Sequence, residues 1–261
     1  MYTTLILETS GHIANITLNR PDKRNAISTT MMAELQTALD EIEKSHVRVA
    51  LITGAGKAFC AGMDLEMLAA IGKQSAAENQ EDSRRIAKMF RRIWSFPRPL
   101  IAAVNGAAYA GGCGIATLCD FTLAAPEAKF GYTEVKIGFL PAIVSVFLTR
   151  QIGEKRSRDL LLTGRIIDAA EAKEFGLVTE IVPAEHLLHR AQELAETLIE
   201  ASPSSLSRAK RLLISSEIAG VDHDLERAIL ENARIRCTPD FQEGLASFLE
   251  KRKPVWQGKP E

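Results

Sequence analysis

The chain has 261 residues, of which 46% are hydrophobic and 25% charged, and its formal net charge at pH 7 is −1. This composition is too apolar for a disordered chain, and the near-zero net charge argues against a nucleic-acid partner or an anionic membrane surface. No apolar run is long enough to span a bilayer, and the first eight residues do not have the pattern of a signal peptide, so we expect a cytoplasmic location and no membrane partner.

The N-terminal third predicts alternating strands and helices. Two strands, at 5–7 and 13–18, are expected to form a hairpin through the turn at Ser10-Gly11. Ser28 is expected to cap a helix whose apolar face carries Met31, Met32, Leu35, Leu39 and Ile42. Residues 47–53 predict a buried strand, which is followed by a glycine-containing loop and a short helix from Asp64. A charged amphipathic helix is predicted at 78–94, with its charges in solvent.

The stretch from Pro99 to Asp120 predicts a strand, a turn and a helix in succession. Residues 100–104 form an apolar run, Asn105-Gly106 marks a turn, and Gly111-Gly112 opens a segment with helical spacing. The small side chain of Ala110 and the two glycines leave backbone N–H groups uncovered at a helix N-terminus, which favours an anion site. Tight packing of the helix on the strand explains the same residues.

The C-terminal half is predicted to be mainly helical. A buried helix is expected at 142–151, and a single strand at 178–182 interrupts the helices that follow. These helices are expected at 155–162, 168–175, 184–199, 204–216, 222–236 and 240–251. We place a domain boundary near 201–205, which divides the chain into a core at 1–200 and a helical region at 201–261. The amphipathic helices beyond it need another surface to cover their apolar faces, and self-association is the simplest source.

Several motifs typical of other functional classes are incomplete, because a required residue is replaced at a defined position. Leu51 and Ala58 break a phosphate-loop pattern around Gly54-Ala-Gly-Lys57, and Thr117 occupies the place of the third glycine of a dinucleotide fingerprint. His186 and His189 have no third metal ligand nearby in the pattern, and the four cysteines contain no CxxC pair, so we expect no metal site.

Five stretches together resemble the crotonase, or enoyl-CoA hydratase/isomerase, superfamily, over essentially the whole chain. They are Leu18–Ala26 (LNRPDKRNA), Ile52–Leu65 (ITGAGKAFCAGMDL), Ala102–Asp120, Leu162–Arg165 with Ala172–Val178, and Phe248–Pro254 (FLEKRKP). The resemblance implies an α/β fold built as a spiral of ββα units. It also implies a C-terminal helical trimerisation region and assembly into a homotrimer or a dimer of trimers.

The same resemblance implies an acyl-CoA thioester substrate, with coenzyme A as part of the substrate and no separate cofactor. The backbone N–H groups of Met63 and Gly111 would hold the thioester oxygen as it becomes enolate-like, which requires donors about 3 Å from that oxygen. The other residues implied in substrate binding are Lys23, Arg24, Ala26, Ala61, Gly62, Asp64, Leu65, Gly112, Gly114 and Pro141. The acyl pocket would be walled by residues 66–95 and 132–147, where Trp94, Phe139 and Phe147 either shape it or pack in the core.

The sequence departs from the family's hydratases at one catalytic position. Those enzymes carry two glutamates, and the first of these positions is Gly114 here, whereas the second is Glu134. Apolar neighbours of Glu134 are expected to raise its pKa, so that it can take and return a proton. A single carboxylate suffices to move a double bond, so the arrangement resembles Δ3,Δ2-enoyl-CoA isomerases more than hydratases.

Two alternatives remain open at this point. Thioester hydrolases of the superfamily share the Gly and Glu pattern, but they carry an Asp where this chain has Ala142. The second alternative is a non-catalytic homologue that binds acyl-CoA or RNA. The first long predicted helix argues against RNA binding, because it is acidic. Its charges include Glu34, Asp40, Glu41 and Glu43 with a single Lys44.

Overall fold

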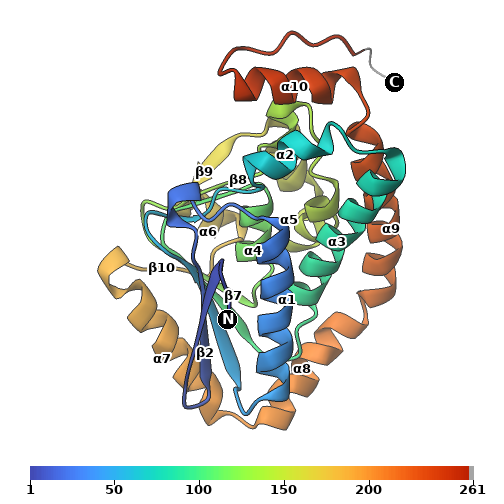
Figure 1. The fold of residues 1–261 in the computed structure, drawn as a ribbon. Coiled ribbons are helices and arrows are strands. Elements are labelled where there is room, and N and C mark those ends of the chain that lie inside the picture. The colour runs from blue at the N-terminus through green and yellow to red at the C-terminus, as the bar shows by residue number, and fades with distance from the viewer. Residues whose placement is uncertain (259–261) are drawn as a thin grey trace.

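The computed structural model describes residues 1–258, in which two sheets are surrounded by helices (Figure 1). The main sheet has the strand order β1-β2-β3-β5-β7-β10, and the second has the order β4-β6-β8-β9. The main-sheet strands are β1 (Leu5–Ser10), β2 (Ile13–Leu18), β3 (Val49–Gly54), β5 (Leu100–Val104), β7 (Phe121–Ala124) and β10 (Glu180–Ile181). The second-sheet strands are β4 (Ala58–Cys60), β6 (Ala107–Tyr109), β8 (Lys129–Gly131) and β9 (Ile166–Asp168).

A ββα unit recurs along the chain. In each unit a strand of the main sheet leads directly into a strand of the second sheet, as β3 leads into β4, β5 into β6 and β7 into β8, and a helical segment follows. The first strands pair in parallel with one another, and so do the second strands. The spiral of ββα units that the family resemblance implied is therefore confirmed.

The α-helices have bounds close to those predicted, and the 3-10 turns among them were not predicted. The α-helices are α1 (Thr29–Lys44), α2 (Leu65–Ile71), α3 (Ala76–Trp94), α4 (Gly111–Thr117), α5 (Ala142–Thr163), α6 (Ala169–Phe175), α7 (Leu187–Glu200), α8 (Pro203–Ser215), α9 (Ile218–Ile235) and α10 (Pro239–Leu249). The 3-10 turns are η1 (Pro21–Lys23), η2 (Glu134–Ile137) and η3 (Ala184–His186). Ser28 caps α1 by accepting a hydrogen bond from the Met31 amide, as predicted.

The central part of the main sheet is buried on both faces because its strands are almost entirely apolar. Alternate residues of a strand point to opposite faces, and in β3 Ala50 and Ile52 belong to the large core that also includes α1 and α3. Val49 and Leu51 belong to a second core on the other face, where Leu187, Ala191 and Ala195 of α7 cover the sheet. This arrangement of parallel strands between helices explains the unbroken apolar runs in the sequence.

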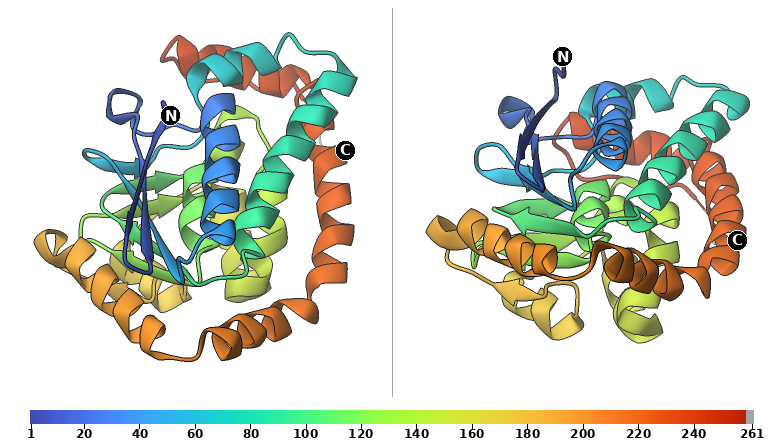
Figure 2. Two further views of the ribbon diagram at one scale, coloured as in Figure 1. Left: turned by 60° about the horizontal axis from the view of Figure 1, so that its bottom comes forward. Right: turned by 90° about the horizontal axis from the view of Figure 1, so that it is seen from below.

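The C-terminal helices return to the core of the same chain. Figures 1 and 2 show α7, α8 and α9 following one another around the outside of the molecule. Helix α9 buries Val221, Leu225 and Ile229 in the large core, beside α3 and α5. The expectation that these helices need self-association to cover their apolar faces is therefore wrong for α9, while α8 has no buried residue.

Two further expectations need correction. The charges of α3 do not simply face solvent, because Arg84 and Arg91 form ion pairs with Glu226 and Asp222 of the neighbouring α9. The strand at 178–182 is not the only one after residue 154, since β9 precedes it and pairs antiparallel with β8. Between residues 1 and 258, no helix is both long and apolar enough to cross a membrane.

Candidate active site

A cavity of about 600 Å³ lies between the turns that follow β4 and β6, helices α2, α3 and α5, and the segment around η2. Charged side chains, those of Asp22, Lys23, Arg24 and Asp64, belong to one part of its lining. Another part is apolar and is supplied mainly by α3, the start of α5 and Phe139-Leu140. A cavity of this size that combines apolar walls with a few polar groups is typical of a small-molecule site.

The turn after β4 presents a backbone amide to the cavity. Ile27 pairs with Met63 as an isolated bridge, in which the Ile27 amide donates to the Gly62 carbonyl and the Asp64 amide donates to the Ile27 carbonyl, at 2.7 and 2.9 Å. Gly62 has a φ of +94°, which glycine adopts without strain. Among the described residues, the Met63 amide has no hydrogen-bond acceptor, and Met63 lines the cavity.

The turn after β6 presents a second amide. Ala110 has a φ of +50°, an uncommon conformation for a residue with a side chain. Its amide donates to the Gly131 carbonyl of β8 at 2.7 Å, and α4 then begins at Gly111. The Gly111 amide has no acceptor within residues 1–258, because the first N–H groups of a helix have no partner inside it.

These two turns lie against each other. A Cβ atom placed on Gly62 would be 3.0 Å from Cβ of Ala110 and 3.1 Å from the Tyr109 carbonyl oxygen. A Cβ atom on Gly111 would be 3.1 Å from Cδ1 of Ile27, the residue that pairs with Met63. The close contact brings two amides without acceptors to one side of the cavity.

Glu134 begins η2 and is 8% exposed. Its Oε2 atom is buried and has no hydrogen-bond partner among the described residues. Burial raises the pKa of the Glu134 carboxyl to about 7, because the apolar surroundings disfavour its charged form. The apolar setting and the raised pKa that the sequence predicted for this carboxyl are both confirmed.

The Gly114 position is filled by neighbouring apolar side chains. A Cβ atom on Gly114 would be 2.8 Å from Cε1 of Phe90 and 2.8 Å from Cγ1 of Val144, and both residues line the cavity. A glutamate could enter here only if these side chains moved. The cavity wall at Gly114 therefore has no second carboxylate, and it has no space for the side chain of one.

The other two carboxylates of the described lining are placed differently from Glu134. Asp64 caps α2 by accepting from the Glu66 amide, and its second oxygen is 2.7 Å from the Arg20 guanidinium. These interactions hold the pKa of Asp64 below its ordinary value. Asp22 is exposed and lies next to Lys23 in η1. Glu134 is thus the only described lining carboxyl that is buried with an unpartnered oxygen.

The basic residues Lys23 and Arg24 stand on a rigid loop. The buried side chain of Asn25 donates to the carbonyls of Ala55 and Ala58 and accepts from the Arg20 amide. Arg24 and Asn25 both have positive φ values, of +50° and +55°. The Lys23 side chain is 57% exposed and its ammonium group has a long 3.5 Å contact with Glu66, so it remains accessible to an anion.

The cavity gathers most of the residues that the resemblance implied. Ten of them line it, namely Lys23, Arg24, Ala26, Ala61, Met63, Asp64, Leu65, Gly111, Glu134 and Pro141. Gly62, Gly112 and Gly114 are not in the lining and instead allow close packing directly behind it. Of the three aromatic candidates, Phe139 lines the cavity, whereas Trp94 and Phe147 pack on each other with ring centroids 5.8 Å apart.

Two lining residues from the C-terminal region were missed. Asn232 of α9 and Phe248 of α10 reach the cavity. A signal for Asn232 was present, because it lies on the same helical face as the buried Leu225, Ala228 and Ile229. Nothing in the local sequence around Phe248 distinguishes it from a core residue.

Comparison with known proteins decides the family. A family model described as "Enoyl-CoA hydratase/isomerase" matches residues 8–259. The chain belongs to the enoyl-CoA hydratase/isomerase family. It is therefore an enzyme of that family, and its fold matches solved structures of the family over nearly the whole chain.

Individual relatives of this enoyl-CoA hydratase/isomerase family member are similar over their full length. A Thermus thermophilus protein named "Putative enoyl-CoA hydratase" is 45% identical over 245 residues, which are 94% of this chain and 97% of that protein. The 2,3-dehydroadipyl-CoA hydratase of Escherichia coli is 32% identical and covers 98% of this chain and 99% of its own. A crystal structure of an enoyl-CoA hydratase/isomerase from Xanthobacter autotrophicus superposes with a TM-score of 0.89 at 30% identity, covering 97% of this chain and 98% of that one.

Proposed function

We propose that this enzyme acts on enoyl-CoA thioesters and moves or hydrates a double bond near the thioester carbonyl. The observation that carries the proposal is the buried carboxyl of Glu134, whose Oε2 has no partner among the described residues, in the same cavity as the free amides of Met63 and Gly111. The family and the names of its relatives, several of them enoyl-CoA hydratases, support the same substrate class.

In the proposed reaction, the two amides accept the charge that develops on the thioester oxygen. Hydrogen-bond donors that are fixed before the reaction stabilise such an oxyanion strongly, because they need no reorganisation when the charge appears. Glu134 removes a proton from a carbon next to the carbonyl or next to the double bond, which gives a dienolate. Returning the same proton to another carbon completes an isomerisation, and the carboxylate is regenerated.

The apolar wall at Gly114 favours isomerisation over hydration. Addition of water requires that a water molecule be positioned and deprotonated, and a second carboxylate ordinarily shares that work. Phe90 and Val144 occupy the space beside Gly114 and offer no hydrogen-bonding group. Hydration would therefore depend on Glu134 for both proton transfers.

The proposal includes the remaining parts of the substrate and the assembly. Lys23 and Arg24 would contact the phosphates of coenzyme A, which enters as part of the substrate, so that no separate cofactor is required. Ala26, Ala61, Asp64 and Leu65 would line the path of its adenine and pantetheine. We further propose a cytoplasmic enzyme that assembles as a homotrimer or a dimer of trimers.

The Glu134→Gln variant tests the role of the carboxyl. General acid–base catalysis by one group contributes about 10²- to 10⁴-fold, so we expect kcat/KM on crotonyl-CoA and on a 3-enoyl-CoA to fall by at least about 100-fold. In the wild type, kcat/KM should decline below pH 7, because protonation of Glu134 removes the base. The ratio of hydrated to isomerised product on the two substrates decides between the two reactions.

Glu127→Gln is a matched control, because Glu127 is an exposed carboxylate outside the cavity. It should keep wild-type turnover. If Glu134→Gln turned over both substrates at the wild-type rate, Glu134 would have no part in the chemistry. Release of free coenzyme A thiol in place of either product would instead indicate a thioester hydrolase.

A further inference from the structure

The apolar wall of the cavity contains one polar side chain. The lining residues from α3 and α5 are Ile86, Met89, Phe90, Ala142, Ile143 and Val144, all of them apolar. Asn232 of α9 joins this wall and is 4% exposed. A buried amide group carries two donors and one acceptor, and each unsatisfied group is costly, so its partners show what it can offer to a ligand.

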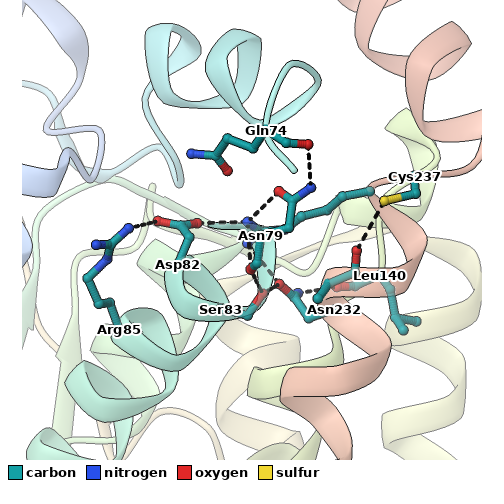
Figure 3. A network of polar contacts seen from close by, with 10 residues as sticks. Gln74, Asn79, Asp82, Ser83, Arg85, Leu140, Asn232 and Cys237 are labelled. Carbon is teal, nitrogen blue, oxygen red and sulfur yellow. Dashed lines mark hydrogen bonds and ion pairs between the residues drawn. The ribbon is translucent and has the colours of Figure 1, made fainter. Parts of the chain in front are cut away.

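The amide oxygen of Asn232 is already engaged by neighbouring polar side chains. Oδ1 accepts a hydrogen bond from the Arg236 guanidinium at 2.9 Å. It also lies 2.9 Å from the Ser83 hydroxyl, whose single hydrogen is shared between Asn232 and the Asn79 carbonyl at 2.8 Å (Figure 3). A guanidinium only donates, so the atom that faces it must be the oxygen and not the nitrogen of the amide. This contact fixes the orientation of the Asn232 side chain.

Arg236 is itself locked in place. Its side chain is fully buried, and one terminal nitrogen is 2.8 Å from Oδ2 of Asp82 on α3. The guanidinium also lies over the ring of Phe139, 5.6 Å from its centroid, and Phe139 lines the cavity. A buried ion pair thus joins Arg236 to α3, and the amide of Asn232 cannot rotate without losing its hydrogen bond to this fixed guanidinium.

The amide nitrogen of Asn232 is therefore the atom turned towards the cavity wall. Its one contact among the described residues is a long one, 3.4 Å, to the carbonyl oxygen of Leu140, another lining residue (Figure 3). An NH₂ group has two hydrogens, so at least one N–H remains without an acceptor in an apolar wall. An acceptor brought in by a ligand would satisfy it.

The position of this donor along the cavity follows from α3. Phe90 lies beside Gly111 and Gly114, whereas Ser83, the partner of Asn232, lies seven residues earlier on the same helix. Seven residues correspond to about 10 Å along a helix axis. The offset along α3 between the residue that contacts Asn232 and the residue beside Gly111 is thus of the order of the length of an acyl chain several carbons long.

We infer that Asn232 is a specificity-determining residue, whose N–H donates a hydrogen bond to an oxygen carried by the acyl chain several carbons from the thioester carbonyl. The inference rests on the proposed function only in taking the apolar part of the cavity as the place of the acyl group. A hydroxyl, a keto group or a carboxylate supplies such an oxygen. The preferred substrates are therefore oxygenated acyl-CoA thioesters and not plain alkyl ones.

Binding of saturated acyl-CoA thioesters tests this inference separately from turnover. We would measure the dissociation constants of octanoyl-CoA, of its hydroxy derivatives at carbons 6, 7 and 8, and of the corresponding dicarboxylic mono-thioester by calorimetry. A single neutral hydrogen bond is worth roughly a factor of 5 to 10, so the best-placed oxygen should tighten binding about that much relative to octanoyl-CoA. Comparison of the hydroxy and carboxy arms shows which oxygen is preferred.

Two variants complete the test. Asn232→Asp keeps an oxygen towards Arg236 and Ser83 but replaces the donor with an acceptor, so the preference for the oxygenated chain should be lost. Ser83→Ala removes only the support behind the amide and should keep the preference, because Arg236 still orients Asn232. If wild-type protein bound octanoyl-CoA as tightly as every oxygenated chain, the inference would be wrong while the proposed function stood. If none of the thioesters bound, both would fall.

Discussion

Burial of the Glu134 carboxyl makes its ionisation unfavourable in the folded chain, which affects stability as well as chemistry. Its pKa is about 7 in the folded protein, against an ordinary value of 4.5. Between these two pH values the folded chain holds a proton that the unfolded chain has released. The free energy of unfolding contributed by this group is therefore fully present below pH 4.5 and is lost as the pH rises through 7.

We predict that Glu134→Gln, which cannot ionise, is more stable than the wild type at pH 8 by about 3 kcal/mol. The difference should shrink to nearly zero below pH 4.5, where the wild-type carboxyl is protonated in both states. Urea unfolding of both proteins across this pH range measures it. The neighbouring Cys113 does not titrate in this range, because burial raises its pKa to about 12.

Glu34 provides a control for a general effect of pH on the free energy of unfolding. Hydrogen bonds from Thr3 and Thr4 lower the pKa of Glu34 to about 2, despite some desolvation. Its contribution is therefore lost as the solution becomes acidic, and Glu34→Gln should show the opposite pH trend. A stability difference between Glu134→Gln and the wild type that did not change with pH would contradict the raised pKa.

At single positions, the sequence predicted correctly those roles that depend on the neighbouring residues in the chain. The apolar neighbours of Glu134 follow it directly in sequence, and its burial was predicted correctly. The filling of the Gly114 position was not predictable, because Phe90 and Val144 come from distant segments. The helical face of Asn232 was visible in the sequence, but its contact with Ser83, 149 residues away, was not.

Among the secondary-structure elements, the contact between α4 and β4 depends on Gly112. A Cβ atom there would be 2.2 Å from the carbonyl oxygen of Cys60, which is backbone and cannot move independently. We predict that Gly112→Ala lowers the free energy of unfolding by about 1–3 kcal/mol, as overpacking does elsewhere. Turnover should fall as well, because the substitution displaces the Gly111 amide from the Met63 turn. Chemical unfolding and enoyl-CoA assays measure the two effects.

Gly220 of α9 supplies a matched control, since it is also a helical glycine. A Cβ atom there would meet only the flexible end of Arg150, at 3.4 Å. Alanine in a helix is favoured over glycine by roughly 0.5–1 kcal/mol, so Gly220→Ala should leave the protein equally or slightly more stable. Equal stability of Gly112→Ala and the wild type would refute the proposed close packing.

Long elements were predictable and short ones were not. Helix α1 shows a complete local signal, with Ser28 as its cap and an apolar face at helical spacing. Strands β4, β6 and β9 have three residues each, too few to establish an alternating pattern. Their pairing with strands far away in sequence holds them in place, so the second sheet was recognised through the family resemblance alone. Gly153, with a φ of +76° and a ψ of 168°, is not helical and breaks α5 in two, so the two helices predicted at 142–151 and 155–162 are confirmed.

At the scale of the whole molecule, one part of the C-terminal region packs on the rest of the same chain and another part leaves apolar side chains exposed. Helix α9 packs on α3 and α5, and Phe241 and Leu245 of α10 pack with Leu68 and Ile71 of α2. The division of the chain near 201–205 remains a prediction. The described chain leaves uncovered the part of α8 that carries Leu212 and Leu213, which are 74% and 76% exposed.

The exposed leucines of α8 lead to a prediction about assembly. Adjacent large apolar side chains in water mark an interaction surface when they lie on a helix that packs little against its own chain, and closed symmetric assembly is the usual way to bury such a surface. We predict that the wild type sediments as a trimer or hexamer, and that Leu212→Lys combined with Leu213→Lys sediments as smaller species at the same concentration. Leu188→Lys, on the exposed side of α7, adds one charge at another exposed leucine and should leave the assembly intact. Far-ultraviolet circular dichroism should show unchanged helicity in the double variant, since neither leucine is buried in the chain. Sedimentation of the wild type as a monomer would show that α8 meets no second copy.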